Sequence, residues 1–411
     1  MKNFKPDNAD QLCEVVKWAA AERVALSVQG GGNLSAMGRP VEAAHLLDLS
    51  GFSGVSLYEA EELVLTAGAA TPLAEIEALL GEHHQMLAFE PPDYSGLLGA
   101  DRLISGRSGD EPRSGTLGGA LAGNLSGPRR FQAGAARDHF LGFRAISGRG
   151  DHFKSGGRVV KNVTGYDLSK LMAGSWGTLA ALWEVTVKVV PRPEKTYTLL
   201  LYGLDDRQAA STMTRALASP HEVSGAAHLP ETVACRSSVS YAGSSGQSVT
   251  ALRVEGPGPS VRHRIDALKD LLGGNIEELH SHNSLKLWRE IRDVRFFARD
   301  VSCDVWRIST PPADCWKVVA GLADIAGAEW FYDAAGGLIW LQCASDVPTD
   351  PVRRALAPEG GHATLWRADP AKRSEVEVFQ PQPPALAALN RRVKESFDPH
   401  HILNPGRIHA D

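Results

Sequence analysis

Three glycine-rich segments have the residue types and spacing to bind a phosphate-bearing ligand. The first, residues 29–35, directly follows the short apolar run 24–28. Backbone N–H groups in such a run have no side-chain bulk beside them and can point together into an anion-binding concavity. We therefore interpret this segment as a phosphate site, with a simple tight turn as the alternative. Its residues are Gln29, Gly30, Gly31, Gly32, Asn33, Leu34 and Ser35.

The second and third segments, residues 114–130 and 156–179, combine glycine with small polar side chains. Because little side-chain bulk holds their backbone away, such segments can lie directly against a large planar ligand. Three segments of this kind in one half of the chain favour one extended ligand. The second segment includes Thr116, Gly118, Gly119, Asn124 and Ser126, and the third includes Gly174, Gly177 and Leu179.

Two common nucleotide sites do not fit this pattern. A Rossmann site needs a strand, then GxGxxG, then a helix whose N-terminus faces the pyrophosphate. Residues 34–40 follow the glycines here, and Gly38 and Pro40 interrupt them, so no helix is expected. A Walker A sequence occurs nowhere in the chain, which argues against a nucleoside triphosphatase.

The bulk composition disfavours other classes of protein. Of the 41 glycines among 411 residues, 26 fall within residues 1–195. A helical bundle does not tolerate that density, because each glycine inside a helix costs about 1 kcal/mol. A net charge of −5 disfavours nucleic acid and anionic lipid as partners. The five cysteines form no CxxC pair and no leader or apolar span is evident, so the sequence predicts a cytoplasmic protein.

Alternating helices and strands are expected to position the glycine segments. Apolar spacing predicts a helix over 10–23 with an Asp or Asn cap. A second helix is expected over 72–80, with Pro72 at its first position and Thr71 as its cap. Pro191 and Pro193 mark the best domain boundary. Strands are expected over 24–28, 62–66 and 180–190.

Beyond this boundary the pattern of strands and helices repeats, which predicts a smaller α+β domain of two similar halves. We expect three parts: residues 1–195, residues 196–374, and a segment 375–411 that returns to the first part. The strands expected beyond the boundary cover 195–202, 248–255, 304–309 and 338–343, and the helices cover 206–218, 260–272, 313–326 and 385–397.

A family resemblance becomes specific when the segments are read in order. They run QGGGN, TLGGALAGNLSGPRR, GGRVVKNVTGYDLSKLMAGSWGTLAALWEVTVKVVPRP and finally FDPHHILNPGRI. The chain resembles proteins with the FAD-binding fold of the vanillyl-alcohol oxidase or p-cresol methylhydroxylase type. Within that fold it is most similar to the FAD-binding subunits of bacterial glycolate oxidases. The resemblance covers residues 5–195 strongly, 196–370 diffusely and 396–408 well.

The resemblance implies an α+β fold: an FAD-binding domain of two α/β subdomains, joined to an α+β cap domain. It also implies roles for individual residues. Residues 29–35 would hold the FAD pyrophosphate, and residues 174–179, with Gly174, Gly177 and Leu179, would approach the adenosine half. The isoalloxazine and pyrophosphate would be lined by Thr116, Gly118, Gly119, Asn124 and Ser126, the flavin wall would continue with Arg137 and Asp138, and Asn404 would return near the flavin. Neither loop 30–35 nor loop 114–130 offers a His or Cys, so noncovalent FAD is expected.

Residues for substrate oxidation are harder to assign. Relatives that oxidise 2-hydroxy acids alone share a His-rich base or metal motif in the C-terminal part, and no such motif is recognised here. His280 and His282 could form a ligand pair on a strand, but the polar surroundings favour a solvated loop. His400 and His401 lie in the closing tail. Arg129, Arg130, Lys161, Tyr166 and Asp167 are candidates that the sequence does not separate, so the catalytic residues stay unassigned and no metal is predicted.

These expectations combine into one function and two alternatives. The resemblance implies an FAD-binding subunit of a glycolate oxidase, working beside a larger flavin subunit and an iron-sulfur subunit. That complex would act on a small 2-hydroxy acid and would meet a membrane only through its partners. One alternative is a free-standing FAD-dependent 2-hydroxyacid dehydrogenase that acts on D-lactate-like substrates. The other is an assembly subunit that has lost the cofactor.

Overall fold

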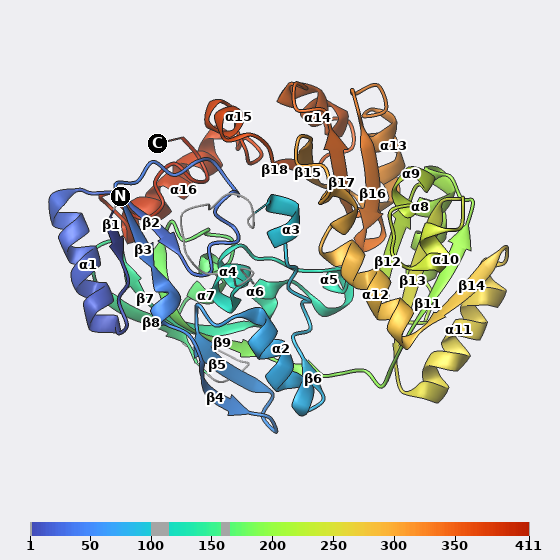
Figure 1. Cartoon of the computed structure of the whole chain (residues 1–411), viewed down its shortest axis with the longest axis horizontal. Coiled ribbons are helices and arrows are strands. Elements are labelled where there is room, and N and C mark those ends of the chain that lie inside the picture. The colour runs from blue at the N-terminus through green and yellow to red at the C-terminus, as the bar shows by residue number, and fades with distance from the viewer. Residues whose placement is uncertain (1, 100–114, 158–164, 411) are drawn as a thin grey trace. The chain divides into compact units, whose positions relative to one another are not determined.

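The computed structural model describes residues 2–99, 115–157 and 165–410 (Figure 1). Contacts between backbone positions divide the chain into two compact units. Unit 1 comprises Met1–Ser126, Gly134–Arg192 and Arg373–Asp411, and unit 2 comprises Gly127–Ala133 and Pro193–Lys372. Within the described residues, no helix combines the length and the apolar character that crossing a membrane requires.

Unit 1 begins with a small parallel sheet of order β1-β3-β2, in which β1 is Lys2–Phe4, β3 is His45–Asp48 and β2 is Leu26–Gln29. Helix α1 (Ala9–Glu22) belongs to the same layer, and its N-cap Asn8 accepts a hydrogen bond from the Gln11 backbone N–H. This helix forms where the sequence predicts it, because Leu12, Val16 and Ala19 follow helical spacing and are fully buried.

The last residues of the chain complete this sheet. Leu403 forms a parallel bridge with Leu26, and the Leu26 N–H donates to the Ile402 carbonyl over 2.7 Å. Leu403 and Ile402 are buried in the same hydrophobic cluster as α1. Helix α16 (Pro384–Phe397) precedes this segment, and the carboxylate of Asp398 accepts the backbone N–H groups of both Ile402 and Leu403. The C-terminal segment is thus part of the N-terminal core.

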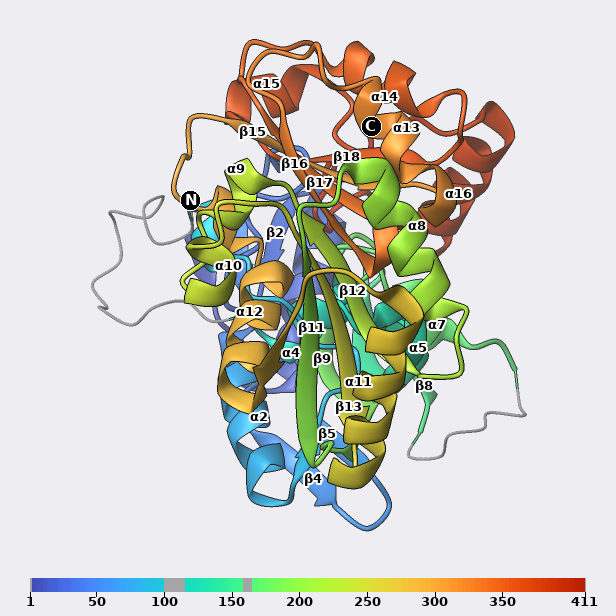
Figure 2. The same cartoon turned by 90° about the vertical axis from the view of Figure 1, so that its right-hand side faces the viewer.

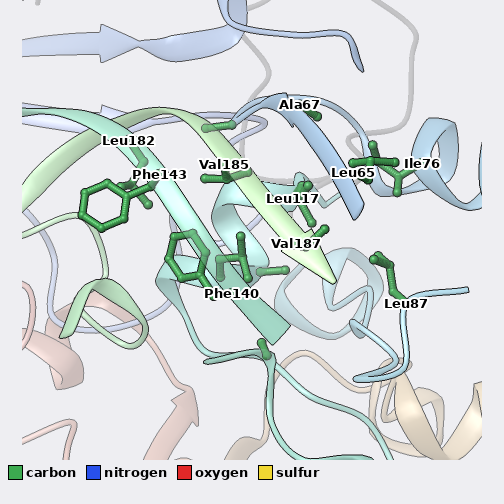
Figure 3. Close-up of a cluster of buried hydrophobic side chains, with 14 of the residues drawn as sticks. Leu65, Ala67, Ile76, Leu87, Leu117, Phe140, Phe143, Leu182, Val185 and Val187 are labelled. Atoms are coloured by element: carbon green, nitrogen blue, oxygen red, sulfur yellow. The ribbon is translucent and has the colours of Figure 1, made fainter. Parts of the chain in front are cut away.

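A second sheet of unit 1 is antiparallel, with order β4-β5-β9-β7-β8. Its hydrophobic core includes Phe140, Val185 and Val187, together with Ile76 and Leu117 from two helices (Figure 3). Alternating apolar side chains on the central strand β9 supply much of this core. The strands are β4 (Val55–Glu59), β5 (Val64–Gly68), β7 (Phe140–Ser147), β8 (His152–Gly156) and β9 (Ala180–Lys188), and the two helices are α2 (Leu73–Glu82) and α4 (Leu117–Ala122).

Unit 2 contains one eight-stranded sheet of order β14-β11-β13-β12-β16-β17-β15-β18 (Figure 2). Numbered from their own first strands, its two halves share the order 4-1-3-2, so the predicted repeat of two similar halves is confirmed. The halves join where His228 pairs with Tyr332. The strands are β11 (Lys195–Tyr202), β12 (Val223–Leu229), β13 (Val249–Gly256), β14 (Ile276–His280), β15 (Asp304–Ser309), β16 (Glu329–Asp333), β17 (Leu338–Cys343) and β18 (His362–Arg367).

Helices of unit 2 pack against this sheet, and α8, α11 and α12 contact its strands β11–β13. These helices are α8 (Asp206–Leu217), α11 (Gly258–Leu272), α12 (Ser281–Arg292), α13 (Cys315–Ala320) and α14 (Thr349–Leu356). Shorter elements of the chain are α3 (Ser95–Leu98), α5 (Arg130–Ala133), α6 (Ala136–His139), α7 (Leu168–Met172), α9 (Glu231–Ala234), α10 (Ser240–Gly243), α15 (Pro370–Glu375), β6 (Gln85–Met86) and β10 (Val190–Pro191).

Two expected helices differ in detail from the structure. Helix α2 begins one residue later than predicted, because Pro72 occupies the cap position and the Thr71 hydroxyl instead donates to the Gly68 carbonyl over 2.7 Å. The helix expected over 313–326 is short, since α13 ends at Ala320 and Gly321 follows as its C-cap. Glycine at that position weakens helix continuation, and the remaining residues form turns.

Candidate functional site

A pocket in unit 1 brings together residues of all three glycine segments and of the C-terminal tail. Its empty volume is about 690 Å³, which includes space open to solvent. The pocket is lined by the loop after β2, by α4, by Arg407 and by Trp176, Gly177, Ala180 and Leu182.

Backbone N–H groups of the loop after β2 are available to a ligand. Among the hydrogen bonds of the described residues, none is donated by the N–H of Gly31, Gly32, Asn33 or Leu34. Gly32 has φ +76°, a conformation that favours glycine, and the turn continues with the Ser35 N–H donating to the Gly32 carbonyl. Successive unpaired N–H groups of this kind form an anion-binding concavity, as the sequence predicts for a phosphate.

Close backbone packing shapes the opposite wall at α4. A Cβ on Gly118 would lie 2.6 Å from the Ala69 carbonyl oxygen, so only glycine fits there. The Thr116 side chain accepts a hydrogen bond from the Gly119 N–H over 3.2 Å and thereby caps the helix. A Cβ on Gly30 would lie 3.1 Å from the same hydroxyl oxygen. The small residues therefore let α4 pack closely against Ala69 and against the loop after β2, which shapes this side of the pocket.

Asn404 joins three separate segments beside the pocket. Its side-chain oxygen accepts the Val28 N–H over 2.8 Å, and its side-chain nitrogen donates to the Trp176 carbonyl over 3.0 Å. Gly177 has φ +71°, and a Cβ there would lie 2.9 Å from the same nitrogen. Asn404 is 1% exposed, so it holds β2 and the third glycine segment in place from behind rather than lining the pocket.

Arg407 lines the pocket, although the sequence analysis did not single it out. Its guanidinium lies 5.6 Å from the Trp176 ring centre and donates from Nη2 to the Leu34 carbonyl over 2.8 Å. Burial and the nearby Arg373 lower the pKa of Arg407 to about 10, so it stays protonated at neutral pH. The closing Asn-Pro-Gly-Arg order of the tail was the available signal, because it puts a cation three residues after Asn404.

The predicted cofactor residues fall into two groups. Those of the first loop line the pocket together with Thr116, Gly118, Gly119 and Gly177. The remaining ones are outside the lining: Asn124, Ser126, Arg137, Asp138, Gly174, Leu179 and Asn404. The lining residues of the first loop are Gln29, Gly30, Gly31, Gly32, Asn33, Leu34 and Ser35.

Hydrogen bonds show what several of the outer residues do. The Asn124 side chain accepts the Arg137 N–H over 3.1 Å, and the Ser126 hydroxyl oxygen accepts the Ala136 N–H over 2.8 Å. The Asp138 carboxylate accepts the Ala135 N–H over 2.8 Å and caps α6. These side chains therefore bind the start of α6 to the end of the second glycine segment.

The two arginines after that segment have different surroundings. Arg129 is 7% exposed and donates from Nε and Nη2 to the two carboxylate oxygens of Glu255, each over 2.9 Å. The Arg253 guanidinium lies 3.5 Å from the same carboxylate. Burial raises the pKa of Glu255, but these two cations outweigh it and lower the pKa to about 2. Arg129 is thus engaged in a buried ion cluster, whereas Arg130 is exposed.

The other candidate residues do not converge on the pocket. His280 ends β14 and lies 3.1 Å from Glu278, whereas His282 is exposed on α12. Tyr166 is 91% exposed. The remaining ones are Asp167 and His400, both exposed, His401, which is half-buried, and Lys161, which lies outside the described residues. Within the described ranges, no group of three or more His, Cys, Asp or Glu residues is arranged to hold a metal ion.

The pocket residues fit a dinucleotide cofactor. Unpaired N–H groups and a buried cation suit a diphosphate, while glycines and the Trp176 side chain offer surface to flat ring systems. A diphosphate carries the negative charge that these donors and the Arg407 cation require. Residues 29–35, Thr116 and Arg407 are placed to hold such a group.

Comparison with known proteins points to the same cofactor. Residues 3–156 match the family model described as FAD binding domain, and residues 375–408 match FAD linked oxidases, C-terminal domain. Glycolate oxidase subunit GlcE of Escherichia coli (strain K12) is 33% identical over 98% of this chain and 98% of its own length. Glycolate oxidase subunit GlcD of Bacillus subtilis (strain 168) is 24% identical over 98% of this chain and 88% of its own length.

Solved structures agree on the fold. That of p-cresol methylhydroxylase with substrate bound aligns with a TM-score of 0.71 at 13% identity, covering 100% of this chain and 88% of that one. The predicted α+β fold of the vanillyl-alcohol oxidase or p-cresol methylhydroxylase type is therefore confirmed. The chain belongs to the FAD-linked oxidases and, within them, to the family of glycolate oxidase subunit GlcE.

Proposed function

We propose, from this family membership, that the chain is the FAD-binding subunit of a glycolate oxidase and supports oxidation of glycolate to glyoxylate by flavin-mediated electron transfer. The observation that carries the proposal is similarity to GlcE over nearly the full length of both chains. The pocket of unit 1 supports it independently, because its donors and its small residues suit FAD. When bound, the flavin supplies the capacity to accept and pass on electrons.

In this proposal the chain's own residues bind and orient the cofactor. The N–H groups of residues 31–34 bind the pyrophosphate, and Thr116, Gly118 and Gly119 form a wall of the same pocket. The third glycine segment, held by Asn404, forms the adenosine side. Asn124, Ser126, Arg137 and Asp138 position the wall behind the second segment. In the same proposal, residues 1–195 form the FAD-binding domain, residues 196–374 form the cap domain, and residues 375–411 return to the FAD-binding domain.

Noncovalent attachment is part of the proposal. Covalent flavins are held by nucleophilic side chains such as His or Cys. Among the described residues that line the pocket, none is His, Cys or Tyr. Acid precipitation of the protein should therefore release all of its flavin.

Partner subunits complete the proposed reaction. The small 2-hydroxy acid would be oxidised within a complex that also contains a larger flavin subunit and an iron-sulfur subunit, and any membrane association would run through them. Support comes from the word subunit in the names of two relatives. Arg129 was a candidate cation for a substrate carboxylate, but it is already paired with Glu255. We therefore propose that a partner subunit binds the substrate carboxylate.

The test is the visible spectrum of the purified chain, before and after acid precipitation and after anaerobic addition of glycolate. We expect a yellow protein whose colour moves to the supernatant, and flavin that glycolate bleaches only when the partner subunits are present. Bleaching of the isolated chain by glycolate or D-lactate would overturn the subunit proposal in favour of a free-standing dehydrogenase. A colourless protein that takes up no FAD would favour an assembly subunit without cofactor.

A further inference from the structure

Arg407 is a buried cation without a protein anion to pair with. Its side chain is 8% exposed and forms no ion pair with any carboxylate among the described residues. Nη2 donates to the Leu34 carbonyl, and the buried Nε has no hydrogen-bond partner in the part of the chain described. The nearest charged neighbour that affects it is Arg373, which is also a cation.

Such an arrangement needs an anion from outside the chain. An uncompensated buried charge is strongly destabilising, and buried polar atoms in native proteins nearly always have partners. The unpaired N–H groups of residues 31–34 lie on the same pocket and also require an acceptor. A buried cation and the residues that carry these backbone donors therefore line the same pocket, which is independent support for one anionic ligand group.

Arg407 also holds the loop that carries these donors. Its carbonyl oxygen accepts the Arg39 N–H over 2.9 Å at one end of the loop, while its guanidinium binds the Leu34 carbonyl inside it. Gly38 has φ +81°, and a Cβ there would lie 2.8 Å from the Arg407 carbonyl oxygen. The tail and the loop can therefore take this arrangement only together.

We propose that Arg407 is the cation that pairs with the FAD diphosphate, and that it couples cofactor binding to closure of the C-terminal segment 398–407 on the loop 29–39. The inference rests on the proposed function in taking FAD as the ligand. Since coupling between binding and closure is reciprocal, FAD stabilises the closed segment by the free energy that closure adds to FAD binding. Without the diphosphate, the buried charge favours opening.

The first experiment measures ligand affinities of Arg407→Met, which keeps much of the side-chain volume and removes the charge. We expect affinity for FAD and for ADP to fall about 10- to 100-fold, as for a lost charge-assisted hydrogen bond. Affinity for riboflavin, which has no phosphate, should stay within a factor of two or so of the wild-type value. Arg392→Met, an exposed arginine on α16, is the matched control and should bind all three ligands like the wild type.

The second experiment follows hydrogen exchange of peptides covering 29–39 and 398–407, with and without FAD. In the wild type FAD should slow exchange in both peptides. In Arg407→Met, saturating FAD should still slow exchange in the loop but should no longer protect the tail. Should Arg407→Met fail to fold, Arg407→Lys retains the charge and should lose only a few-fold in ADP affinity.

The outcomes separate this inference from the proposed function. Equal FAD and ADP binding by Arg407→Met and wild type, or equal protection of the tail, would overturn the inference and leave the proposed subunit function intact. Diphosphate-dependent loss in a chain that never exchanges electrons with a glycolate-oxidising partner would support the inference and overturn the function. A wild-type chain that binds neither FAD nor ADP would overturn both.

Discussion

Buried arginines are treated differently in the two units of the molecule. In unit 2, Arg129 and Arg253 flank the carboxylate of Glu255 and form a cluster that the chain completes itself. In unit 1, Arg407 is about as buried as Arg129, but it forms no ion pair with a carboxylate of the described residues. A cation that the fold neutralises is part of the architecture, whereas one left without an anion beside a pocket marks where a charged ligand belongs.

Glu255→Gln is the strongest way to break this comparison. The neutral amide would leave two buried guanidinium groups without their anion, and we expect the free energy of unfolding to fall by about 3–5 kcal/mol. Denaturant unfolding measures the loss. Glu395→Gln, which removes the partner of Arg391 in an exposed pair on α16, is the control and should cost no more than about 1 kcal/mol. A similar small loss for both variants would contradict a structural role of the Glu255 cluster.

Gly118→Ala tests whether the pocket of unit 1 depends on shape as well as charge. The new Cβ would lie 2.6 Å from a backbone oxygen that cannot move alone, so we expect a loss of about 1–3 kcal/mol in stability together with weakened FAD binding. Thermal unfolding and fluorescence titration with FAD check both effects. Gly157→Ala has no atom of the described residues within 4 Å of its new Cβ and should behave like the wild type. Unchanged FAD affinity in Gly118→Ala would show that the packing of α4 against Ala69 does not shape the FAD site.

Acidification should destabilise unit 2 through its buried His228, whereas the buried Arg407 of unit 1 should not respond. Burial lowers the pKa of this side chain from 6.5 to about 3, and its Nδ1 lies 2.8 Å from the Thr250 hydroxyl. The unfolded chain therefore binds this proton first, and stability falls as pH drops below about 6.5, by about 2 kcal/mol at pH 5. Arg407 stays charged between pH 7 and pH 5, so it does not contribute to the pH dependence of stability.

The measurement is the denaturant midpoint between pH 7 and pH 5. His228→Gln should flatten the dependence, while His282→Gln at an exposed position should leave it unchanged. A persistent slope in His228→Gln would assign the effect to other groups.

Thr116→Val is the smallest change and concerns a neutral contact of the same pocket. It removes the oxygen that accepts the Gly119 N–H at the start of α4, and we expect about 1 kcal/mol less stability. Thr116→Ser restores the acceptor and should recover most of the loss in thermal unfolding. If Ser does no better than Val, the cap contributes nothing and side-chain packing explains the effect.

The sequence was sufficient to predict which segments form the pocket, but not which individual side chains contact one another there. Glycine clusters report backbone that must lie close to something, so residues 29–35, Gly118 and Gly177 are all found at one cavity. The identification of the ligand as FAD came from the family resemblance and not from the spacing of the glycines. Repetition of strands and helices was enough to predict the two halves of unit 2, because both follow the same local apolar pattern.

Other contacts depend on tertiary structure that spacing does not encode. Asn124 and Ser126 have the same residue types as ligand-binding side chains, yet both bind the backbone at the start of α6. Arg407 meets Leu34 across 373 residues of sequence, and only its place in the closing Asn-Pro-Gly-Arg order distinguishes it from a surface arginine. The overlong helix prediction at 313–326 failed because helical spacing continues past Gly321, where the backbone does not.

The bridge between Leu26 and Leu403 has a consequence for synthesis of the chain on the ribosome. Strand β2 is synthesised first, but the Asn404 side chain that accepts the Val28 N–H, and the neighbouring edge partner Leu403, follow 376 residues later. The pocket is then completed only after residues 403–407 have been synthesised, so a chain that stops before them lacks a complete cofactor site. Cofactor loading thereby reports that translation has passed this segment.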